Sequence, residues 1–422
     1  MSRPATGAAV LGQTADEFTA EAQAFLQANA PRRPAEKQRQ WGRGSDAVII
    51  FQREPLGKAS EQLRAARQWV QTRFDHGFGW ITGPAEFGGR ELDSSFQLLY
   101  NEMEAQYVVP DFANDLGMVG INLVVPTIYA HGTDEQREAY LRPILRGELI
   151  GCQLFSEPGA GSDLAALQTR AVRDGDDWIV NGQKVWTSLA HCSELGELLC
   201  RTDPAAAKHN GITAFLLDMN TPGVDVRPLR QMTGGAEFNE VFFNDVRIPD
   251  AHRLGPVNGG WKVGLTTLLT ERSAVGSDDV IAAEGALNVQ WLIAMLDALD
   301  LLQDPHARRG LAELYVKRAS TERLREQLNR AARDGRTPGP EASALKLLNT
   351  RNVNDAVQYV SEVLGPKLIA DNGQWGTYAW SELLLSVPAL RLVGGTDEVM
   401  RNIIGERVLG LPKEPSVAEA RR

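Results

Sequence analysis

The N-terminal part of the chain carries apolar residues at helical spacing. Phe18, Ala22 and Phe25 fall on one face of a segment that opens near residue 14. Apolar residues at every third or fourth position predict an amphipathic helix. Thr133 and Gln136 form a capping box, which predicts a helix running to residue 145. Further helices are predicted at residues 63–74, 95–107 and 123–131.

The middle of the chain changes to short β-like runs. These runs are separated by Gly, Asn, Asp and Pro, which is typical of strands joined by turns. We therefore expect a small antiparallel β domain here. The runs lie at residues 179–180, 214–217, 224–226 and 240–248.

Helical spacing returns after this region. We expect Pro388 to stop the helix over residues 380–387, because proline lacks the N–H that continues a helix. The chain as a whole is predicted to be mainly α with a central antiparallel β domain. Helices are expected from about residue 260, over 288–302, 308–334, 342–364 and 380–387, and from near 396. The expected domains are an N-terminal helical domain (1–148), a middle β domain (149–256), a C-terminal helical bundle (257–410) and a flexible tail (411–422).

Composition and charge exclude several classes of function. The 422 residues carry a formal net charge of −10, which argues against nucleic acid as the main partner. No apolar run reaches the roughly 18 residues that a membrane-spanning helix needs, so we expect no membrane insertion. The three cysteines and six histidines show no metal-ligand spacing, so no metal site is expected. Cysteine usage favours a reducing, cytoplasmic location.

Residues 151–189 carry the chemistry that the rest of the chain is organised around. Gly159 and Gly161 stand beside Ser162, a composition that suits a loop whose N–H groups point at an anion. Trp186 is a flat ring for stacking, and Ser188 follows it with a hydroxyl for a polar ring edge. Together these features predict a nucleotide cofactor site.

Two segments in this stretch resemble the acyl-CoA dehydrogenase family. They are Ser-Glu-Pro-Gly-Ala-Gly-Ser-Asp at residues 156–163 and Lys-Val-Trp-Thr-Ser at residues 184–188, and the resemblance extends to residues 393–412. It implies three domains (α, β-barrel and α four-helix bundle), FAD as cofactor and an acyl-CoA substrate. It also implies electron transfer to an electron-transfer flavoprotein, a tetramer, and a role in β-oxidation or in lipid or sterol catabolism.

The resemblance also points to a catalytic base. In this family a carboxylate removes the α-proton, and an apolar pocket raises its pKa toward working pH. One place for the Glu is a C-terminal Tyr-Glu-Gly segment, where this chain has Gly394 instead. The other, used by the isovaleryl and long-chain branches, matches Glu271 on the first helix after the β domain. Leu268 and Val275 lie on the same helix face, which is largely apolar. The alternative is that Glu271 is a solvated surface carboxylate.

The C-terminal segment supplies further candidates by resemblance. The N–H of Gly394 is expected to bond the thioester carbonyl, with Gly395 beside the substrate. The alternative is a plain turn at these glycines. Thr396 and Glu398 match positions that reach the adenosine half of FAD. Arg272 is a neighbour of the substrate or of the base, or else forms a surface ion pair.

The cofactor contacts are likewise implied by the resemblance. Phe155 and Ser156 are expected to meet the flavin ring and its pyrimidine edge. Trp186 is expected near the dimethylbenzene end and Ser188 near N5. Ser162 would touch the pyrophosphate or the CoA. The alternative for Trp186 is core packing beneath a hairpin.

The chain departs from the family pattern at the part of the FAD site that a neighbouring subunit completes. The family's Arg-x-x-Phe-Gly segment is missing, because no Arg or Lys occurs between Arg272 and Arg308. Glu362, shortly before Gly365, stands where the family has Gln. A carboxylate near a pyrophosphate is unfavourable.

Three functions stay open at this point. The first is an acyl-CoA dehydrogenase, and the second is an acyl-CoA oxidase that reoxidises its flavin with oxygen. The third is one subunit of a mixed tetramer with a partly structural role, which the departures around Glu362 favour. The acyl group is equally open among linear, branched, aromatic and sterol types.

Overall fold

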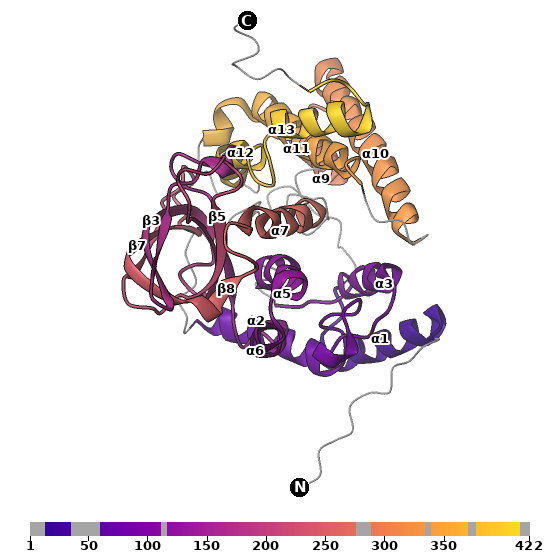
Figure 1. The fold of residues 1–422 in the computed structure, drawn as a ribbon. Helices are drawn as coiled ribbons and strands as arrows, with labels where there is room; N and C mark the ends of the chain where they lie inside the picture. The colour runs from indigo at the N-terminus through magenta and orange to yellow at the C-terminus, as the bar shows by residue number, and fades with distance from the viewer. Residues whose placement is uncertain are drawn as a thin grey trace, which may run out of the picture. The chain divides into compact units, whose positions relative to one another are not determined.

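The computed structural model describes residues 13–34, 60–110, 116–275, 288–333, 339–369 and 377–413. Its contacts divide the chain into two compact units, and the boundary falls within helix α7 (Gly260–Val275), after Glu271. The first unit holds the N-terminal helices and all the strands, and the second holds the C-terminal helices (Figure 1). Each unit has a hydrophobic core of its own.

The N-terminal helices of the first unit begin where the sequence predicts. Thr14 and Thr133 each form a capping box, with Glu17 and with Gln136 respectively, so both predicted starts are confirmed. A π-helix, η2 (Gly117–Val124), leads directly into α5 and was not predicted. The helices are α1 (Ala15–Asn29), α2 (Glu61–Asp75), η1 (Ala85–Phe87), α3 (Ser94–Glu104), α5 (Val125–His131) and α6 (Asp134–Leu145).

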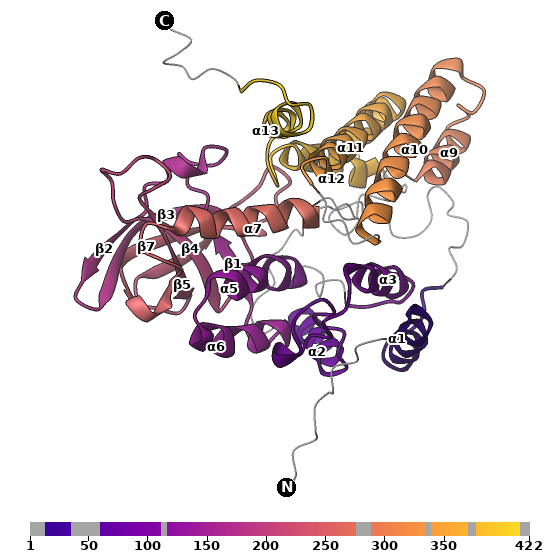
Figure 2. The ribbon, with the colours of Figure 1, turned by 45° about the vertical axis from the view of Figure 1, so that its right-hand side comes forward.

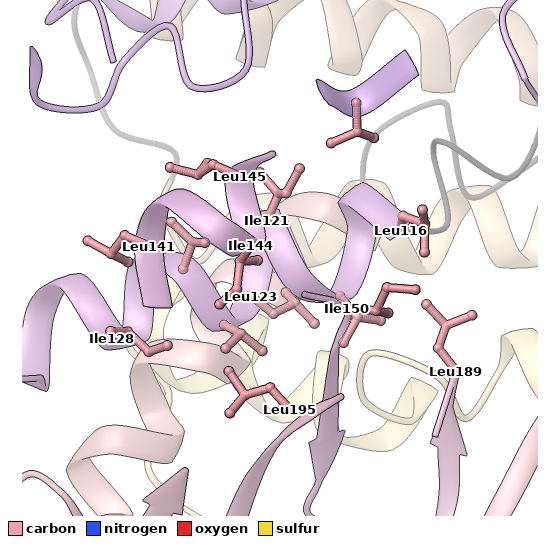
Figure 3. Close-up of a cluster of buried hydrophobic side chains, with 14 of the residues drawn as sticks. Leu116, Ile121, Leu123, Ile128, Leu141, Ile144, Leu145, Ile150, Leu189 and Leu195 are labelled. Atoms are coloured by element: carbon pink, nitrogen blue, oxygen red, sulfur yellow. The ribbon is translucent and has the colours of Figure 1, made fainter. Parts of the chain in front are cut away.

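A continuous apolar core joins these helices to the sheet. It contains Leu123 and Ile128 from the η2–α5 segment, Ile144 from α6, and Leu195, the first residue of β4 (Figure 3). Leu and Ile side chains dominate it, which is the usual content of a close-packed protein interior. The N-terminal helices and one side of the sheet therefore share a core, and the sheet has a second core of its own around Trp178, Phe215 and Val241.

The strands form one sheet in the order β6-β7-β3-β2-β4-β5-β8, with β1 paired to β4. Most pairs are antiparallel, as predicted, but β1 and β4 run parallel, and so do β2 and β4 where Arg170 meets Arg201. The strands are β1 (Gly151–Leu154), β2 (Arg170–Asp174), β3 (Asp177–Ser188), β4 (Leu195–Arg201), β5 (Ile212–Asp218), β6 (Val224–Pro228), β7 (Phe238–Pro249) and β8 (Arg253–Leu254). Two short 3-10 turns, η3 (Leu164–Ala166) and η4 (Asp250–His252), connect them.

The first turns of α7 pack against both the sheet and α5 (Figure 2). Gly260 starts the helix so close to β5 that an added Cβ would lie 2.6 Å from the backbone N of Ala214. His131 Nε2 on α5 lies 2.8 Å from Thr266 Oγ1 on α7. These contacts fix α7 against its surroundings up to the residue that the sequence singles out as a base.

The second unit is a helical bundle whose core surrounds α11. Its helices are α9 (Val289–Ala298), α10 (Pro305–Arg333), α11 (Ala342–Leu364), η6 (Gly365–Ile369), α12 (Thr377–Leu390), α13 (Asp397–Ile403) and η7 (Ile404–Val408). The prediction that Pro388 stops α12 is wrong, because the helix continues to Leu390. Pro388 lies in the last turn, where only one intrahelical bond is lost.

Two further expectations concern the ends and the membrane. The predicted flexible tail lies outside the described residues from position 414 onward. Among the residues that the structure describes, no helix is both long and apolar enough to span a bilayer.

Candidate active site

A buried ion pair ties the two motif segments together. Lys184 Nζ on β3 lies 2.8 Å from Glu157 Oε1 and donates a second bond of 2.9 Å to the carbonyl oxygen of Phe155. The N–H groups of Gln168 and Thr169 also donate to the Glu157 carboxylate. Burial opposes ionisation of Glu157, but the lysine charge and these donors outweigh it and hold the pKa of Glu157 below its usual value. Sequence analysis assigned neither residue a role, although both stand inside the quoted motifs.

Trp186 protrudes from the sheet at a bulge. The register of β3 against β7 shifts between Lys184 and Thr187, and Trp186 there has a φ of +61°. Its side chain is 57% exposed and contacts only the edge of Phe238, with ring centroids 5.8 Å apart, among the described aromatic pairs. The core-packing alternative for Trp186 is therefore excluded. A strained, exposed aromatic residue of this kind is typical of a ligand site.

Three buried polar atoms beside Trp186 have no hydrogen-bond partner among the described residues: Thr187 Oγ1, His191 Nε2 and Asn239 Oδ1. Asn239 Nδ2 bonds the carbonyl oxygen of Thr187 and His191 Nδ1, each at 3.0 Å. Burial lowers the pKa of His191, which favours the neutral ring, and because the Asn239 amide nitrogen donates to Nδ1, the ring proton is assigned to Nε2. Buried polar groups are normally paired, so this cluster suits the polar edge of a bound ring.

Sequence reasoning missed His191 and Asn239. His191 stands only three positions after Ser188, but a lone histidine gives no signal by itself. Asn239 reaches the cluster through the pairing of β7 with Thr187 on β3, which no local pattern reveals.

The glycine loop after β1 is open on its outer side. Glu157 and Ala160 exchange two backbone hydrogen bonds, which closes a tight turn around Gly159. A Cβ added at Gly159 or Gly161 would meet nothing within 4 Å. Ser162 is exposed, and the next residue, Asp163, forms an ion pair with Lys208. The loop therefore has room for a phosphate group, with a lysine nearby that sequence analysis did not single out.

Phe155, Ser156 and Ser188 line the same end of β3. The carbonyl oxygen of Ser156 accepts a 2.9 Å bond from the N–H of Val185. Ser188, the last residue of β3, pairs with Phe238, the first residue of β7. The ring of Phe155 is buried, and a Cβ added at Gly264 on α7 would lie 3.5 Å from it. The flavin contacts expected of these residues stay predictions.

Glu271 lies on α7 with its side chain half-buried, facing β1. Gln153 Nε2 approaches Glu271 Oε2 at 3.5 Å. Gln153 stands two residues before Phe155, so the fold brings the predicted base to the start of the cofactor motif. Because this carboxylate is partly buried and contacts β1, the solvated-carboxylate alternative is weakened. The side chains of Arg272 and of the residues up to 275 lie outside what the structure describes.

In the second unit, Gly394 and Gly395 form a turn with φ values of +66° and +103°. Lys346 Nζ, on a buried side chain of α11, donates a 2.7 Å bond to the carbonyl oxygen of Gly395. A Cβ at Gly395 would lie 2.6 Å from Met400 Cε. The two glycines therefore do form a turn, as the alternative interpretation expected. The role expected of the Gly394 N–H toward the substrate stays a prediction. Sequence reasoning missed Lys346.

The remaining predicted cofactor residues have local partners. Thr396 is the N-cap of α13, where its Oγ1 accepts from the N–H of Val399 at 3.3 Å. Glu398 is exposed and lies 3.6 Å from Arg401. Glu362 is exposed near the end of α11, and Gly365 follows that helix with a φ of +50°. Their roles toward FAD stay predictions.

The described residues offer neither a metal centre nor a reactive thiol. No group of three His, Cys, Asp or Glu side chains in the described ranges is arranged to hold a metal ion. All three cysteines are buried and none forms a disulfide among the described residues, and burial raises the pKa of Cys200 to about 12.

Comparisons with known proteins agree with this arrangement. The chain matches the acyl-CoA dehydrogenase N-terminal domain over residues 51–148, the middle domain over 152–246 and the C-terminal domain over 258–409. It is 36% identical to "Acyl-CoA dehydrogenase IpdE1" of Mycobacterium tuberculosis over 85% of this chain and 91% of that protein. It is 40% identical to "Acyl-CoA dehydrogenase FadE34" of the same organism over 68% of this chain. The matched region covers only 39% of that longer protein.

Solved structures show the same fold. The "Tcur3481-Tcur3483 steroid ACAD" superposes with a TM-score of 0.73 at 28% identity, covering 94% of this chain and 98% of that one. The ChsE4-ChsE5 complex from Mycobacterium tuberculosis superposes with a TM-score of 0.69 at 28% identity, covering 96% of this chain and 100% of that one. The predicted fold class is confirmed.

The residues present fit the flavin that this family uses. The exposed ring of Trp186 offers a stacking surface, and the unpartnered atoms of Thr187, His191 and Asn239 offer a donor and acceptors for a polar ring edge. The open loop at Gly161 offers room for phosphate. From its three matched domains and its relatives, we conclude that this chain belongs to the acyl-CoA dehydrogenase family of FAD-dependent oxidoreductases that act on CH–CH groups.

Proposed function

We propose that this chain catalyses the α,β-dehydrogenation of an acyl-CoA thioester to a trans-2-enoyl-CoA, with Glu271 as the base that takes the α-proton. One observation carries the proposal: a half-buried carboxylate on α7 meets Gln153, three residues before the cofactor motif that begins at Ser156. A general base must lie within reach of the proton that it removes, and this position is the one that the family's second branch uses.

The other residues have supporting roles in this proposal. The N–H of Gly394 polarises the thioester carbonyl, which acidifies the α-carbon, and Lys346 holds the turn through Gly395. Trp186, Ser188 and Ser162 hold the cofactor. Bound there, FAD would supply the hydride acceptor for the β-hydrogen.

The substrate class proposed is a branched or polycyclic acyl-CoA, as in lipid or sterol catabolism. Two observations support it. The chain has Gly394 where other members of the family carry a Glu, so no Glu side chain occupies that position. One relative that matches over most of its length is named a steroid acyl-CoA dehydrogenase.

The electron acceptor proposed is an electron-transfer flavoprotein. The acyl-CoA oxidase reading differs from it in one measurable product, hydrogen peroxide. Reducing the purified protein with substrate under anaerobic conditions and then admitting air separates the two. Slow reoxidation without stoichiometric peroxide supports the dehydrogenase.

We further propose that the chain is the catalytic subunit of a mixed tetramer. This chain has no Arg or Lys between Arg272 and Arg308, and it has Glu362 where the family has Gln. It therefore lacks the residues with which the family completes a neighbour's FAD site. One structural relative is described as the ChsE4-ChsE5 complex, and another is named after two proteins, Tcur3481 and Tcur3483. Flavin content per subunit tests this: near-zero flavin in the chain purified alone supports the mixed assembly, and one flavin per subunit in a homotetramer contradicts it.

The experiment that tests the proposed reaction is a panel of linear, branched, aromatic and steroid-derived acyl-CoA thioesters, added anaerobically to the flavin-loaded protein. Bleaching of the flavin absorbance reports reduction, and mass analysis of the product reports loss of two hydrogens. Absence of bleaching by every thioester in the panel would count against the reaction.

A further inference from the structure

Glu197 on β4 is completely buried, and the proposed reaction does not use it. Its Oε1 lies 2.7 Å from Thr267 Oγ1 on α7, and its Oε2 has no hydrogen-bond partner among the described residues. A buried carboxylate is normally paired with a cation or accepts several donors, because burying an unpaired charge is costly. Of the ion pairs found in the described residues, none includes Glu197.

The groups around Glu197 do not supply the missing charge. Its register partners are Gln153 on β1 and Leu216 on β5, and both are uncharged. Where α5 packs against α7, Thr127 on α5 bonds Thr267 on α7, and Thr127 is uncharged. The described titratable side chains of these helices lie further along them: Tyr129 and His131 on α5, with His131 bonded to Thr266, and Lys262 and Glu271 on α7.

Glu197 begins a chain of three short oxygen–oxygen contacts. Thr267 Oγ1 lies 2.9 Å from Thr127 Oγ1, which in turn lies 2.9 Å from the carbonyl oxygen of Leu123. Each contact needs one proton between its two oxygens. The two threonine hydroxyls supply only two protons, and the carbonyl supplies none.

Counting protons therefore decides the state of the carboxyl group. If Glu197 is ionised, one of the three contacts brings two lone pairs together without a proton. If Glu197 is a carboxylic acid, it donates to Thr267, Thr267 donates to Thr127, and Thr127 donates to Leu123. Every contact is then a hydrogen bond, and no charge is buried.

The two cross-strand neighbours Glu197 and Gln153 hold two points on α7. Glu197 bonds Thr267, and Gln153 meets Glu271, which stands one helical turn later. Fixing Thr267 therefore sets where the turn that carries Glu271 sits against β1. The same helix face is held from α5 through Thr127.

We propose that Glu197 is a positioning residue: as a neutral carboxylic acid it donates the third proton of this chain, and by fixing Thr267 it sets the position of Glu271. The catalytic part of this inference rests on the function proposed for Glu271. The protonation of Glu197 does not, because it follows from the contacts alone.

The proposal gives a definite pH dependence. Burial raises the pKa of Glu197 from 4.5 to about 8. Between these values the unfolded chain has lost the proton and the folded chain keeps it, so stability falls as the pH rises. The stabilisation is complete below pH 4.5 and is lost by the time the pH passes about 8.

The test compares the wild-type full chain, in the assembly that binds flavin, with its Glu197→Gln and Thr267→Val variants in the same assembly. Gln keeps a donor to Thr267 but cannot titrate, and Val removes the hydroxyl at the same volume. Infrared difference spectra of wild type minus Glu197→Gln at neutral pH should show the carbonyl band of a protonated acid. A difference containing only carboxylate bands overturns the assignment of the proton.

Two further readouts separate positioning from packing. The apparent Tm of the wild type should fall with pH between 4.5 and 8 relative to that of Glu197→Gln, and parallel curves overturn the proposal. The rate of flavin reduction should drop above pH 8 in the wild type but not in Glu197→Gln. Thr267→Val should reduce that rate about tenfold at every pH, and an unchanged rate overturns the positioning role.

The outcome also distinguishes this inference from the proposed function. If the acid band and the Tm difference are present while no thioester bleaches the wild-type flavin, the reaction is wrong and the protonated Glu197 stands. If the wild type turns over and neither signature of the acid appears, Glu197 is ionised and the inference fails alone.

Discussion

Gln153 Nε2 and Glu271 Oε2 lie 3.5 Å apart, which joins the strand before the cofactor motif to the helix that carries the proposed base. This distance is at the limit of a hydrogen bond, so the amide orients the carboxylate without binding it strongly.

Replacing Gln153 tests how much this orientation matters. We expect Gln153→Met to slow anaerobic flavin reduction by less than about tenfold, because a weak hydrogen bond contributes on the order of 1 kcal/mol. Stopped-flow absorbance at saturating thioester measures the rate. A loss as large as that of a Glu271 variant would mean that the amide itself takes part in the chemistry.

The buried pair of Lys184 and Glu157 is expected to support folding of the cofactor loop. Lys184→Met leaves the Glu157 carboxylate buried without its cation, so the free energy of unfolding should fall by roughly 3–5 kcal/mol. Chemical denaturation measures this change. The double variant Lys184→Met with Glu157→Gln removes the charge as well and should recover part of the loss; a double variant as unstable as the sum of both singles would contradict the pairing.

The same pair predicts how the loop responds to acid. The folded-state pKa of Glu157 lies below its unfolded value of 4.5. Its contribution is therefore fully present above pH 4.5 and is lost as the pH falls through the lower folded-state value. Glu157→Gln should flatten the decline in stability below pH 4.5, measured as Tm against pH. An identical decline in the variant would assign the acid sensitivity elsewhere.

The exposed ring of Trp186 should matter for the cofactor and not for the fold. Trp186→Ala removes a side chain that is 57% exposed, so the Tm of the flavin-free protein should change little. Loss of a stacking surface should weaken FAD binding about tenfold or more. Quenching of flavin fluorescence on titration gives the Kd. If FAD affinity were unchanged, the assignment of this residue would fail.

The glycine turn can be tested with a matched control. Gly394 and Gly410 have nearly equal φ values, +66° and +67°, so an alanine at either site costs a similar amount, about 1 kcal/mol. Only Gly394→Ala should also raise KM or slow flavin reduction by thioester, because only that N–H is proposed to meet the carbonyl. Equal kinetic behaviour of the two variants would make the turn purely structural.

Local sequence signals predicted the helices well, because caps act over a few residues. Thr14 and Thr133 mark the starts of α1 and α6. The strand β4 was missed, because nearly all its residues are buried and it lacks the polar alternation of an exposed strand. The helix stop predicted at Pro388 was wrong, because proline breaks helix interiors and Pro388 lies in the last turn of α12, which ends at Leu390.

The site was predictable only where a motif carries it. Trp186 and Glu271 stand in recognisable segments, whereas Glu197 and Thr267 are 70 positions apart and meet only through packing of α7 on the sheet. His191 and Asn239 are brought together in the same way by the pairing of β3 with β7. Polar groups that become partners through tertiary packing leave no local pattern.

The most direct test of the account is Glu271→Gln, with Glu313→Gln on the exposed face of α10 as control. Both variants should bind FAD and keep its absorbance. Anaerobic bleaching by the preferred thioester should fall by roughly 10²–10⁴-fold in Glu271→Gln, because only the base is removed, and should be unchanged in the control. Bleaching of Glu271→Gln at the wild-type rate would contradict the assignment of Glu271 as the base.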